Sequence, residues 1–496
     1  MNINIKQIFN ALGRKDADAL NHLIVVLPDT LTTRKWPIFP YAETLKQRLS
    51  SAGEKPDADY ILVTDLPNKV GTRAALAFIK PDAPSFELLT LARKLAARQL
   101  ESRPRNIALF VSGFDADYNN RIAEALIAAL LASAAAMPDY KSTKKKASRL
   151  NTIQLYGSNA KLDFKRTVAE AEGNNLARRL TALPPNELTP KIYRQQITGL
   201  ARENGWRMQF LDINTLKRKK AGAFLAVVQG SEERDAGIVH LTYKPKSARR
   251  ARSLALVGKG ICYDTGGMNL KPAKHMHGMH EDMEGSAVAL GTLLALTQLQ
   301  VPFTIHCWLA LAQNHIGPRA YKQNDVITAG NGTTIEVMHT DAEGRMVLAD
   351  TLALASKEPP ALIIDYATLT GTCVYALSTR YSGVFTNRDP LVPTLIAAGR
   401  DSGERVWPFP IDKDFDKALE STIADIKQCT LEGEADHILA ARFLSRFVDN
   451  RPWIHVDLAA GNHKGGLAHI PTDITGFGVR FTLNLLLDKQ VMETLS

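Results

Sequence analysis

Three short stretches of this chain concentrate residues that could carry out chemistry. They are VGKGICYDTGGMNLKP at 257–272, MHEDMEGSA at 279–287 and HTDAEGRMVLADTL at 339–352. Each stretch ends an expected strand or begins an expected helix, where an α/β fold presents side chains to a crevice. We therefore expect the functional site to be assembled from these three stretches.

The three stretches supply acidic side chains together with a lysine. Asp264 lies five residues after Lys259, and Asp282, Asp341 and Glu343 lie just before two expected helices. Lys259 and Asp264 alone fit a salt bridge across a loop better than a metal site. Several carboxylates in one crevice, however, cannot all stay ionised without a counter-cation, and divalent metals are the usual solution. A lysine buried beside a metal can lose its proton and act as a neutral nitrogen ligand. The pattern indicates a pair of divalent ions, as in many hydrolases.

Arg345 stands two residues after Glu343, so one of the pair can bind metal while the other holds an anion at a helix N-terminus. A competing metal site is offered by His275, His277 and His280, because imidazole is a common metal ligand. The glycine and methionines around these histidines favour a loop that lines a substrate cleft. We therefore expect the carboxylates to bind the metal.

Other catalytic patterns are missing from the sequence. It contains no GxSxG elbow, GxxxxGK[ST] phosphate loop, HExxH motif or GxGxxG strand–helix turn. Serine hydrolases, NTPases, zincins and dinucleotide-binding enzymes therefore lose their best support.

The elements that must position these residues alternate between strands and helices. Before about residue 165 this alternation predicts a mostly parallel sheet, and the region shows no catalytic constellation. An amphipathic helix over 163–183 is expected to link this region to the rest of the chain. The expected strands of the first region are 22–28, 60–66, 74–80, 106–114 and 151–157, and its expected helices are 85–100 and 118–136.

After the linking helix, the run at 253–260 is almost continuously apolar, which is typical of a strand buried on both faces. A chain of 496 residues exceeds what one core usually supports, so two domains are expected. Other expected strands in this region are 207–212 and 236–244, and the expected helices are 191–206, 285–299 and 344–356.

Composition is that of a globular protein, with 45% hydrophobic residues. The four cysteines are far apart and predict neither a disulfide framework nor a zinc ribbon, which favours a reducing cytoplasm. Apolar runs are interrupted or shorter than the roughly 20 residues of a membrane span. The N-terminus lacks the apolar core of a signal peptide. We expect a cytoplasmic protein without membrane association.

The formal charge of +10 arises from 61 basic and 51 acidic residues, and much of the excess lies at 141–149, 217–220 and 244–252. Such clusters can attract nucleic acid. No aromatic residues interleave with them and no nucleic-acid motif accompanies them. Solvated loop charge is therefore the favoured interpretation, with nucleic-acid binding as the alternative.

Taken together, the motifs resemble those of the leucyl aminopeptidase family, cytosolic two-metal exopeptidases. VGKGICYDTGG resembles the family's VGKG-x-x-FDSGG, and EDM at 281–283 falls where the family has its DMGG aspartate. TDAEGR at 340–345 is the family's most specific signature. The resemblance covers roughly residues 170–490 and extends to LKP at 270–272, ATLTG at 367–371, NELTP at 186–190 and IADIK at 423–427.

The resemblance implies an α/β protein of two domains. A smaller N-terminal α/β domain, 1–165, would serve structure or assembly, and a helix at 166–185 would link it to the catalytic domain, 186–496. That larger domain would have a mixed central sheet flanked by helices. Family members are homohexamers that remove the N-terminal residue from peptides, so we expect release of leucine or another apolar residue.

The resemblance also implies a role for each matching residue. Lys271 would polarise the scissile carbonyl and stabilise the tetrahedral oxyanion. Arg345 would hold a bicarbonate ion that takes a proton from the attacking water, whose pKa the metal lowers. Two divalent ions, manganese or zinc, would be bound by Lys259, Asp264, Asp282, Asp341 and Glu343, and the peptide would be aligned by Met279, Thr368, Leu369 and Gly371.

The chain departs from the family pattern near these residues. His339 stands where the family has Asn, Glu284 replaces a glycine of DMGG, and CTLEGEADHILAARFL at 429–444 replaces a glycine-rich approach to a helix. Because the ligands all remain, we expect an active enzyme. Its substrate preference and metal selectivity stay open, because His339 and Glu284 lie beside the ligands, where neighbouring groups set ligand orientation. The alternative is a DNA-binding or assembly protein on a peptidase scaffold. A catalytically silent homologue is disfavoured because Lys271 and Arg345 are retained.

Overall fold

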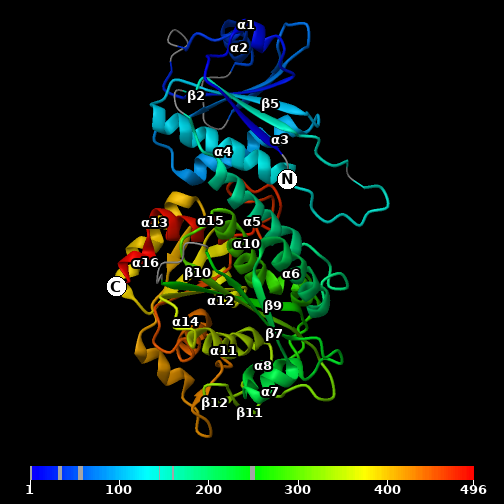
Figure 1. The fold of residues 1–496 in the computed structure, drawn as a ribbon, viewed down its shortest axis with the longest axis vertical. Coiled ribbons are helices and arrows are strands. Elements are labelled where there is room, and N and C mark those ends of the chain that lie inside the picture. Colours follow the sequence, from blue (N-terminus) through cyan, green and yellow to red (C-terminus); the bar gives the residue numbers. More distant parts are fainter. Residues whose placement is uncertain are drawn as a thin grey trace. The chain divides into compact units, whose positions relative to one another are not determined.

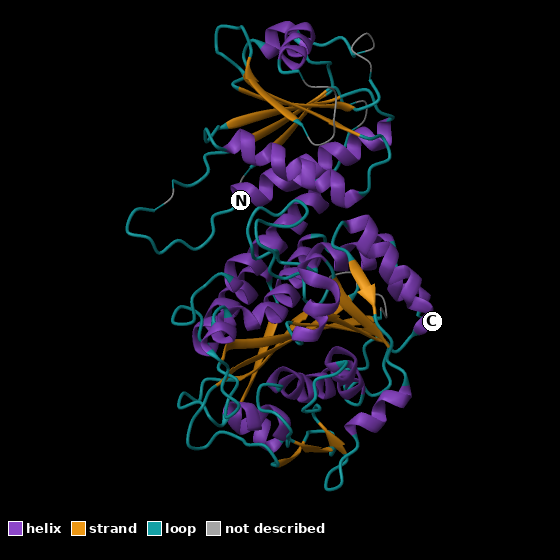
Figure 2. Ribbon diagram, turned by 180° about the vertical axis from the view of Figure 1, so that it is seen from behind, coloured by secondary structure: helices purple, strands orange, loops and turns teal. Residues whose placement is uncertain are grey.

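The computed structural model describes residues 3–31, 36–53, 60–144, 146–158, 161–245 and 252–495. Two compact units divide the chain: Met1–Ala171 with Lys464–Asp473, and Glu172–His463 with Ile474–Ser496. The segment Lys464–Asp473 belongs to the first unit, a return of the chain that the sequence-based division did not include. Both units combine sheets and helices, which confirms the predicted α/β class (Figure 2). Across the described residues, the helices are all too short or too polar to traverse a bilayer.

The first unit is built on a six-stranded sheet of order β1-β6-β5-β2-β4-β3. Its pairs are parallel except β3 with β4, so the predicted mostly parallel sheet is confirmed. The strands are β1 (Asn4–Ile8), β2 (His22–Pro28), β3 (Ile61–Asp65), β4 (Arg73–Ile79), β5 (Asn106–Val111) and β6 (Thr152–Tyr156), and the helices are α1 (Arg14–Ala17), α2 (Ala42–Ser51), α3 (Ser85–Leu100) and α4 (Ala116–Ala134).

Strand β2 shows why its sequence, HLIVVLP, is apolar throughout. Side chains alternate between the two faces of a strand. Ile24 and Val26 pack into the core that contains residues of α3 and α4. Leu23 and Val25 pack into the core that contains residues of α1 and α2. Both faces of the sheet are therefore covered by helices.

Helix α5 (Lys165–Thr181) is the predicted linking helix, and it ends before the paired prolines at 184–185. Its glycine, Gly173, marks a close crossing with α10 (Glu284–Gln298). A Cβ atom on Gly173 would lie 2.4 Å from the carbonyl oxygen of Gly291, and a Cβ on Gly291 would lie 2.3 Å from that of Gly173. The two helices can therefore touch backbone to backbone only because both positions are glycine.

The second unit contains an eight-stranded mixed sheet of order β15-β14-β17-β13-β9-β10-β8-β7. Its centre is parallel, because β9 pairs in parallel with both β13 and β10. The mixed central sheet flanked by helices is confirmed (Figure 1). The strands are β7 (Arg207–Asp212), β8 (Gly237–Tyr243), β9 (Ser253–Asp264), β10 (Thr304–Asn314), β13 (Leu362–Ala367), β14 (Ser382–Thr386), β15 (Val406–Pro408) and β17 (Trp453–Asp457); a small separate sheet holds β11 (Val326–Thr328), β12 (Thr334–Glu336) and β16 (Ile426–Lys427).

Helices α10 and α11 (Glu343–Ser356) lie on opposite faces of this sheet (Figure 1). Val257 and Ile261 of β9 pack into the core that contains α11. Gly258, on the other face, lies against the first turn of α10, where a Cβ would be 2.4 Å from Ser286 Cα. The remaining helices of the unit are α6 (Pro190–Asn204), α7 (Ile213–Arg218), α8 (Gly222–Val228), α9 (Ala273–Met276), α12 (Gly371–Leu377), α13 (Val392–Ser402), α14 (Asp436–Ser445), α15 (Val479–Leu483) and α16 (Val491–Thr494).

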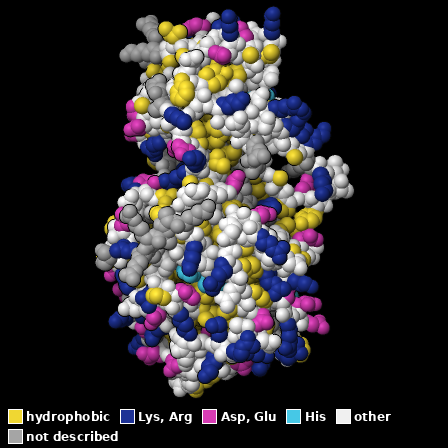
Figure 3. Space-filling view, in the orientation of Figure 1, with side chains coloured by type: hydrophobic (Ala, Val, Ile, Leu, Met, Phe, Trp, Pro, Cys, Tyr) yellow, Lys and Arg dark blue, Asp and Glu magenta, His cyan; other side chains and the backbone are white. Residues whose placement is uncertain are grey.

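The basic clusters lie in loops and at a helix end. The described residues of 141–149 are exposed between α4 and β6, and 217–220 are exposed at the end of α7. Residues 246–251 of the third cluster lie outside the described residues. On the face drawn in Figure 3, Lys and Arg side chains are interspersed with Asp and Glu. This arrangement is typical of solvated surface charge.

Candidate metal centre

Glycines bring two helix N-termini against the central strands. At Gly344, in the first turn of α11, a Cβ would lie 2.6 Å from Lys259 Nζ. At Gly285, in the first turn of α10, it would lie 2.1 Å from the carbonyl oxygen of Tyr366. A side chain at Gly285 would displace the backbone of β13, and one at Gly344 would displace the side chain of Lys259. The first turns of both helices, and the acidic residues before them, are thereby held at the carboxyl end of β9.

Lys259 is the centre of one buried ionic group. Its Nζ lies 2.7 Å from Asp282 Oδ1 and 2.9 Å from Glu343 Oε1. It also donates a hydrogen bond of 2.9 Å to the carbonyl oxygen of Thr368, whose hydroxyl donates to Asp282 Oδ1 at 2.7 Å. Burial opposes the charge on Lys259, but Asp282 and Glu343 outweigh it and raise the pKa of the ammonium. The lysine is thus cationic in the absence of metal.

Lys271 is the centre of a second group. Its Nζ lies 3.0 Å from Asp264 Oδ2 and 2.6 Å from Asp341 Oδ1. Asp264 Oδ1 accepts hydrogen bonds of 2.8 Å from the amide of Asn314 and from the backbone N–H of Gly266. Burial opposes the charge of Lys271, yet Asp264 and Glu343 prevail and raise its pKa. Asn314, at the end of β10, was not predicted; its position at the end of the strand that pairs with β9 is the signal that could have identified it.

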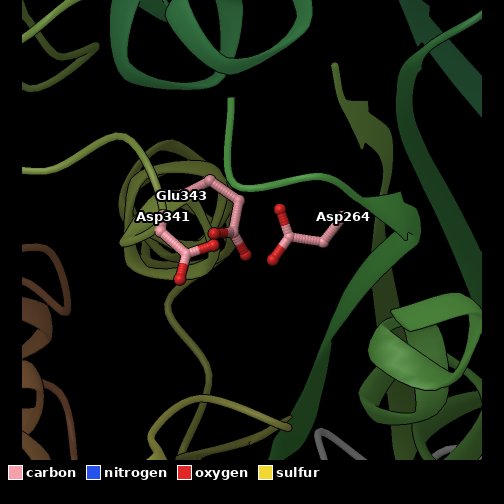
Figure 4. Close-up of side chains that lie close together, drawn as sticks. All are labelled: Asp264, Asp341 and Glu343. Carbon is pink, nitrogen blue, oxygen red and sulfur yellow. The ribbon is translucent and has the colours of Figure 1, made fainter. Parts of the chain in front are cut away.

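Asp264, Asp341 and Glu343 each offer one oxygen atom within 4.8 Å of the others, and Figure 4 shows the three carboxylates turned toward one another. Burial raises the pKa of Asp264, and it raises that of Asp341 to about 7. Burial opposes the charge of Glu343 as well, but Lys259 and Lys271 hold its pKa below the ordinary value. A carboxyl with a raised pKa beside an ionised one indicates a shortage of positive charge.

The residues present fit divalent cations. Counting Asp282, four carboxylates face two ammonium groups, which leaves an excess of negative charge. Asp282 Oδ2 and Glu343 Oε2 are buried and lack a hydrogen-bond partner within the described structure. Orphaned buried carboxylate oxygens are costly unless a cation meets them. Among the residues described, Asp264, Asp341 and Glu343 form the one cluster suited to a metal. His275, His277 and His280 do not form one.

A cleft of about 470 Å³ opens onto this cluster. The five predicted metal ligands and Lys271 all line it, as do the predicted substrate residues Met279, Thr368, Leu369 and Gly371. Met279 comes from the short 3₁₀ turn Met279–Met283, Thr368 and Leu369 come from the turn between β13 and α12, and Gly371 begins α12. The structure thus brings together every predicted site residue except Arg345.

Asp457, the last residue of β17, fixes that turn. Its Oδ1 accepts hydrogen bonds from the backbone N–H groups of Leu369 at 3.0 Å and Thr370 at 3.4 Å, and its Oδ2 accepts from the Thr370 hydroxyl at 2.6 Å. Burial raises the pKa of Asp457. Asp457 was not predicted, although an aspartate that ends the apolar strand WIHVD is a usable signal.

Arg345 has close contacts that were not predicted. It is buried at the start of α11, where its Nη2 donates to both carboxylate oxygens of Asp436 at 2.8 Å and its Nη1 to the carbonyl oxygen of Gln428 at 2.9 Å. The predicted bicarbonate does not fit, because a planar anion needs two adjacent N–H donors and Asp436 already occupies Nη2. The segment around Asp436 departs from the family pattern in the sequence, but its contact with Arg345 was not predicted.

The structure also places Glu284 and His339, the two departures from the family pattern beside the predicted ligands. Glu284 is 1% exposed and packs under Gly461, where a Cβ would lie 2.2 Å from its Oε2. Burial first, and then Glu281, raises its pKa well above the ordinary value. Burial lowers the pKa of His339, whose Nδ1 lies 3.3 Å from the backbone nitrogen of Asp341. A neutral His339 can therefore accept a hydrogen bond from the backbone of Asp341, a predicted metal ligand.

Comparisons with known proteins agree with this geometry. A model of the cytosol aminopeptidase family, catalytic domain, matches residues 175–483. A probable cytosol aminopeptidase of Gloeobacter violaceus is 38% identical, and the match covers 64% of this chain and 63% of that protein, just under two thirds of its length. A probable cytosol aminopeptidase of Wolbachia pipientis wMel is 40% identical over 67% of both chains, and one of Polaromonas is 33% identical over 96% of this chain and 92% of its own.

Two solved structures are similar over nearly the whole chain. A mutant of tomato leucine aminopeptidase superposes with a TM-score of 0.87, at 27% identity over 98% of this chain and 96% of its own. The bottromycin maturation enzyme BotP in complex with Mn superposes with a TM-score of 0.82, at 28% identity over 95% of this chain and 100% of its own.

Proposed function

The chain belongs to the cytosol aminopeptidase family, and on that premise we propose that it is a metal-dependent aminopeptidase. It would remove the N-terminal residue of a peptide by hydrolysing the first peptide bond. The observation that carries the proposal is the buried meeting of four carboxylates with Lys259 and Lys271 in one open cleft. A structural ion-pair network has no need of such a cleft. Perturbed carboxyl groups in a cleft are a mark of catalytic sites.

Two divalent ions, manganese or zinc, would be held by Lys259, Asp264, Asp282, Asp341 and Glu343. When bound there, they supply Lewis acidity and a water of lowered pKa. Lys259 would have to give up its proton to become a ligand, and the metal charge would drive that loss. Asn314 and Gly266 hold Asp264 in place, and Thr368 holds both Lys259 and Asp282. These hydrogen bonds orient the ligands before metal arrives.

Lys271 would act on the substrate. It lies at the wall of the cleft and its raised pKa keeps it cationic at neutral pH. A positive group at this place can polarise the scissile carbonyl and stabilise the oxyanion that forms on it. Its present contacts with Asp264 and Asp341 also show that it neutralises part of the acidic cluster.

The N-terminal residue of the peptide would lie against Met279, Thr368, Leu369 and Gly371, which border the cleft. Met279 and Leu369, with Val374 beside them, favour an apolar residue such as leucine. Glu284 lines the same cleft, so its replacement is the first test of what sets the preference for the N-terminal residue of the substrate. By family resemblance we also propose a cytoplasmic homohexamer; light scattering of the purified protein tests the assembly.

The test is release of leucine from a leucyl-anilide by protein loaded with manganese or zinc, with and without chelator, followed by a panel of aminoacyl substrates. We expect turnover that chelator abolishes. Lys271→Met should abolish it, whereas Lys274→Met, an exposed lysine three residues away, should not. A folded, metal-loaded protein without turnover on any aminoacyl substrate would remove the proposal.

A further inference from the structure

The contacts of Arg345 indicate which anion binds its guanidinium group. Arg345 is 2% exposed and lies two residues after Glu343. Both oxygen atoms of Asp436 accept from its Nη2 at 2.8 Å, and the side chain of Asp436 remains 23% exposed. A carboxylate has the same planar pair of oxygens as bicarbonate, so it presents the same surface to a guanidinium. The chain itself therefore supplies an anion to Nη2 of Arg345, whereas Nε is buried without a hydrogen-bond partner among the described residues.

The backbone places Asp436 for this contact. Asp436 is the first residue of α14, and Ala435 before it has a φ of 51°, a left-handed conformation that alanine rarely adopts. The next residue, His437, is tied to α12 because its backbone N–H donates to the Thr372 hydroxyl at 3.0 Å. Helix α12 begins at Gly371, which lines the cleft. The N-terminus of α14 is thus anchored to the wall of the proposed active site.

Gln428 ties the other side of Arg345 to the loop that carries Asp341. Its carbonyl oxygen accepts from Arg345, and its side-chain oxygen accepts from the backbone N–H groups of Met338 at 2.8 Å and His339 at 3.2 Å. Movement of Arg345 would therefore be passed to that loop. Whatever anion holds Arg345 also holds the loop of a proposed metal ligand.

We propose that Asp436 takes the place of the bicarbonate ion at Arg345, so that the protein carries its own anion and its activity does not depend on bicarbonate in solution. The inference rests on the proposed aminopeptidase function. Asp436 is a positioning residue in this scheme: it acts on the metal loop through Arg345 and Gln428. Activity should therefore fall when the carboxylate of Asp436 is removed, and added bicarbonate should restore it.

The experiment uses the full-length, metal-loaded protein in buffer stripped of carbon dioxide, with bicarbonate added against a chloride series of equal ionic strength. Wild-type turnover of the leucyl-anilide should be unchanged by bicarbonate. Asp436→Ala should lose activity, on the order of 100-fold as expected for displaced ligands, and should regain most of it with bicarbonate. It should also gain melting temperature with bicarbonate, a readout that does not depend on activity.

Asp416→Ala is the matched control. Asp416 is 27% exposed and forms a two-pronged pair with Arg442 of the same helix α14, with contacts of 2.8 and 2.6 Å. Its variant should show no response to bicarbonate in turnover or melting temperature. Asp436→Asn keeps the shape of the side chain without its charge, so it should lose activity and respond less to bicarbonate than the alanine variant.

Several outcomes would overturn the inference. They are a wild-type enzyme that bicarbonate activates several-fold, an Asp436→Ala protein as active as wild type without bicarbonate, and an inactive Asp436→Ala protein that bicarbonate neither reactivates nor stabilises. If the alanine variant does not fold, the wild-type bicarbonate series and Asp436→Asn decide. A wild-type protein without turnover on any substrate would instead count against the aminopeptidase function, while the melting series would still test the anion site.

Discussion

Replacement of Asp457 tests whether the turn after β13 positions the proposed metal ligands. In Asp457→Ala, the backbone N–H groups of Leu369 and Thr370 and the Thr370 hydroxyl lose their acceptor in a buried place. Each buried polar group left unpaired costs about 1–3 kcal/mol, and one of the three hydrogen bonds is long at 3.4 Å. We therefore expect the free energy of unfolding to fall by about 3–6 kcal/mol.

The same change should reach the metal site. The turn contains Thr368, which holds Lys259 through its carbonyl oxygen and Asp282 through its hydroxyl. Loss of groups that orient metal ligands typically lowers metal affinity or activity by about 10–100-fold. Asp457→Ala should therefore bind metal more weakly and remain slow at saturating metal. Asp457→Asn, which keeps one acceptor oxygen, should lose only about 1–2 kcal/mol of stability.

The assays are urea unfolding of the metal-free protein followed by tryptophan fluorescence, calorimetric titration with manganese, and turnover of a leucyl-anilide. Thr370→Val is the control, because it removes the hydroxyl and leaves Asp457 to accept from both N–H groups. Its stability should fall by about 1 kcal/mol with little change in metal affinity. A folded Asp457→Ala protein with wild-type metal affinity and turnover would refute the proposed role of the turn.

Three further predictions follow from the buried groups of the second unit. Metal should raise the free energy of unfolding, by about 2.7 kcal/mol when it is present at 100 times its dissociation constant, and a chelator titration followed by thermal melting measures this. Burial raises the pKa of Asp350 to about 6. The stabilising contribution of the protonated carboxyl is therefore complete below the unfolded pKa near 3.8 and is lost as the pH rises to 6. Asp350→Asn should flatten the pH dependence of the free energy of unfolding in urea by about 3 kcal/mol across that window, and an unchanged profile would contradict this. The pKa of Glu284 is raised in the same sense, so the stability of Glu284→Gln relative to wild type should increase as the pH of the metal-free protein rises above about 4.3, and a constant difference would contradict it.

The sequence predicted the residues that the local chain pattern places at strand and helix ends. The apolar run before Lys259 predicted a buried strand, and the acidic residues before 285–299 and 344–356 predicted that helix N-termini would face the same crevice as Asp264. These predictions succeeded because strand ends and helix starts meet at one edge of a parallel sheet. Hydrophobic periodicity and the positions of glycine indicate where strands end and helices begin.

Other parts of the site could not be predicted because their partners lie far away in the chain. Asp457 meets Leu369 only because β17 pairs with β13, and Asp436 meets Arg345 only because α14 begins beside α11. For that reason the contact between Asp436 and Arg345 was not anticipated when bicarbonate was predicted at Arg345. Strand β1 was missed as well, because NIKQI is polar and partly exposed and so lacks the apolar run used to identify the other strands of the first unit.

The return of Lys464–Asp473 to the first unit bears on how such a protein can be cut or recombined. The backbone passes between the two units three times, after Ala171, after His463 and after Asp473. A single protease cleavage near residue 171 would therefore leave both fragments incomplete, one lacking a ten-residue piece and the other carrying it as a foreign insert. A gene fusion that exchanged only the first 171 residues for an unrelated module would leave that insert without its native surroundings.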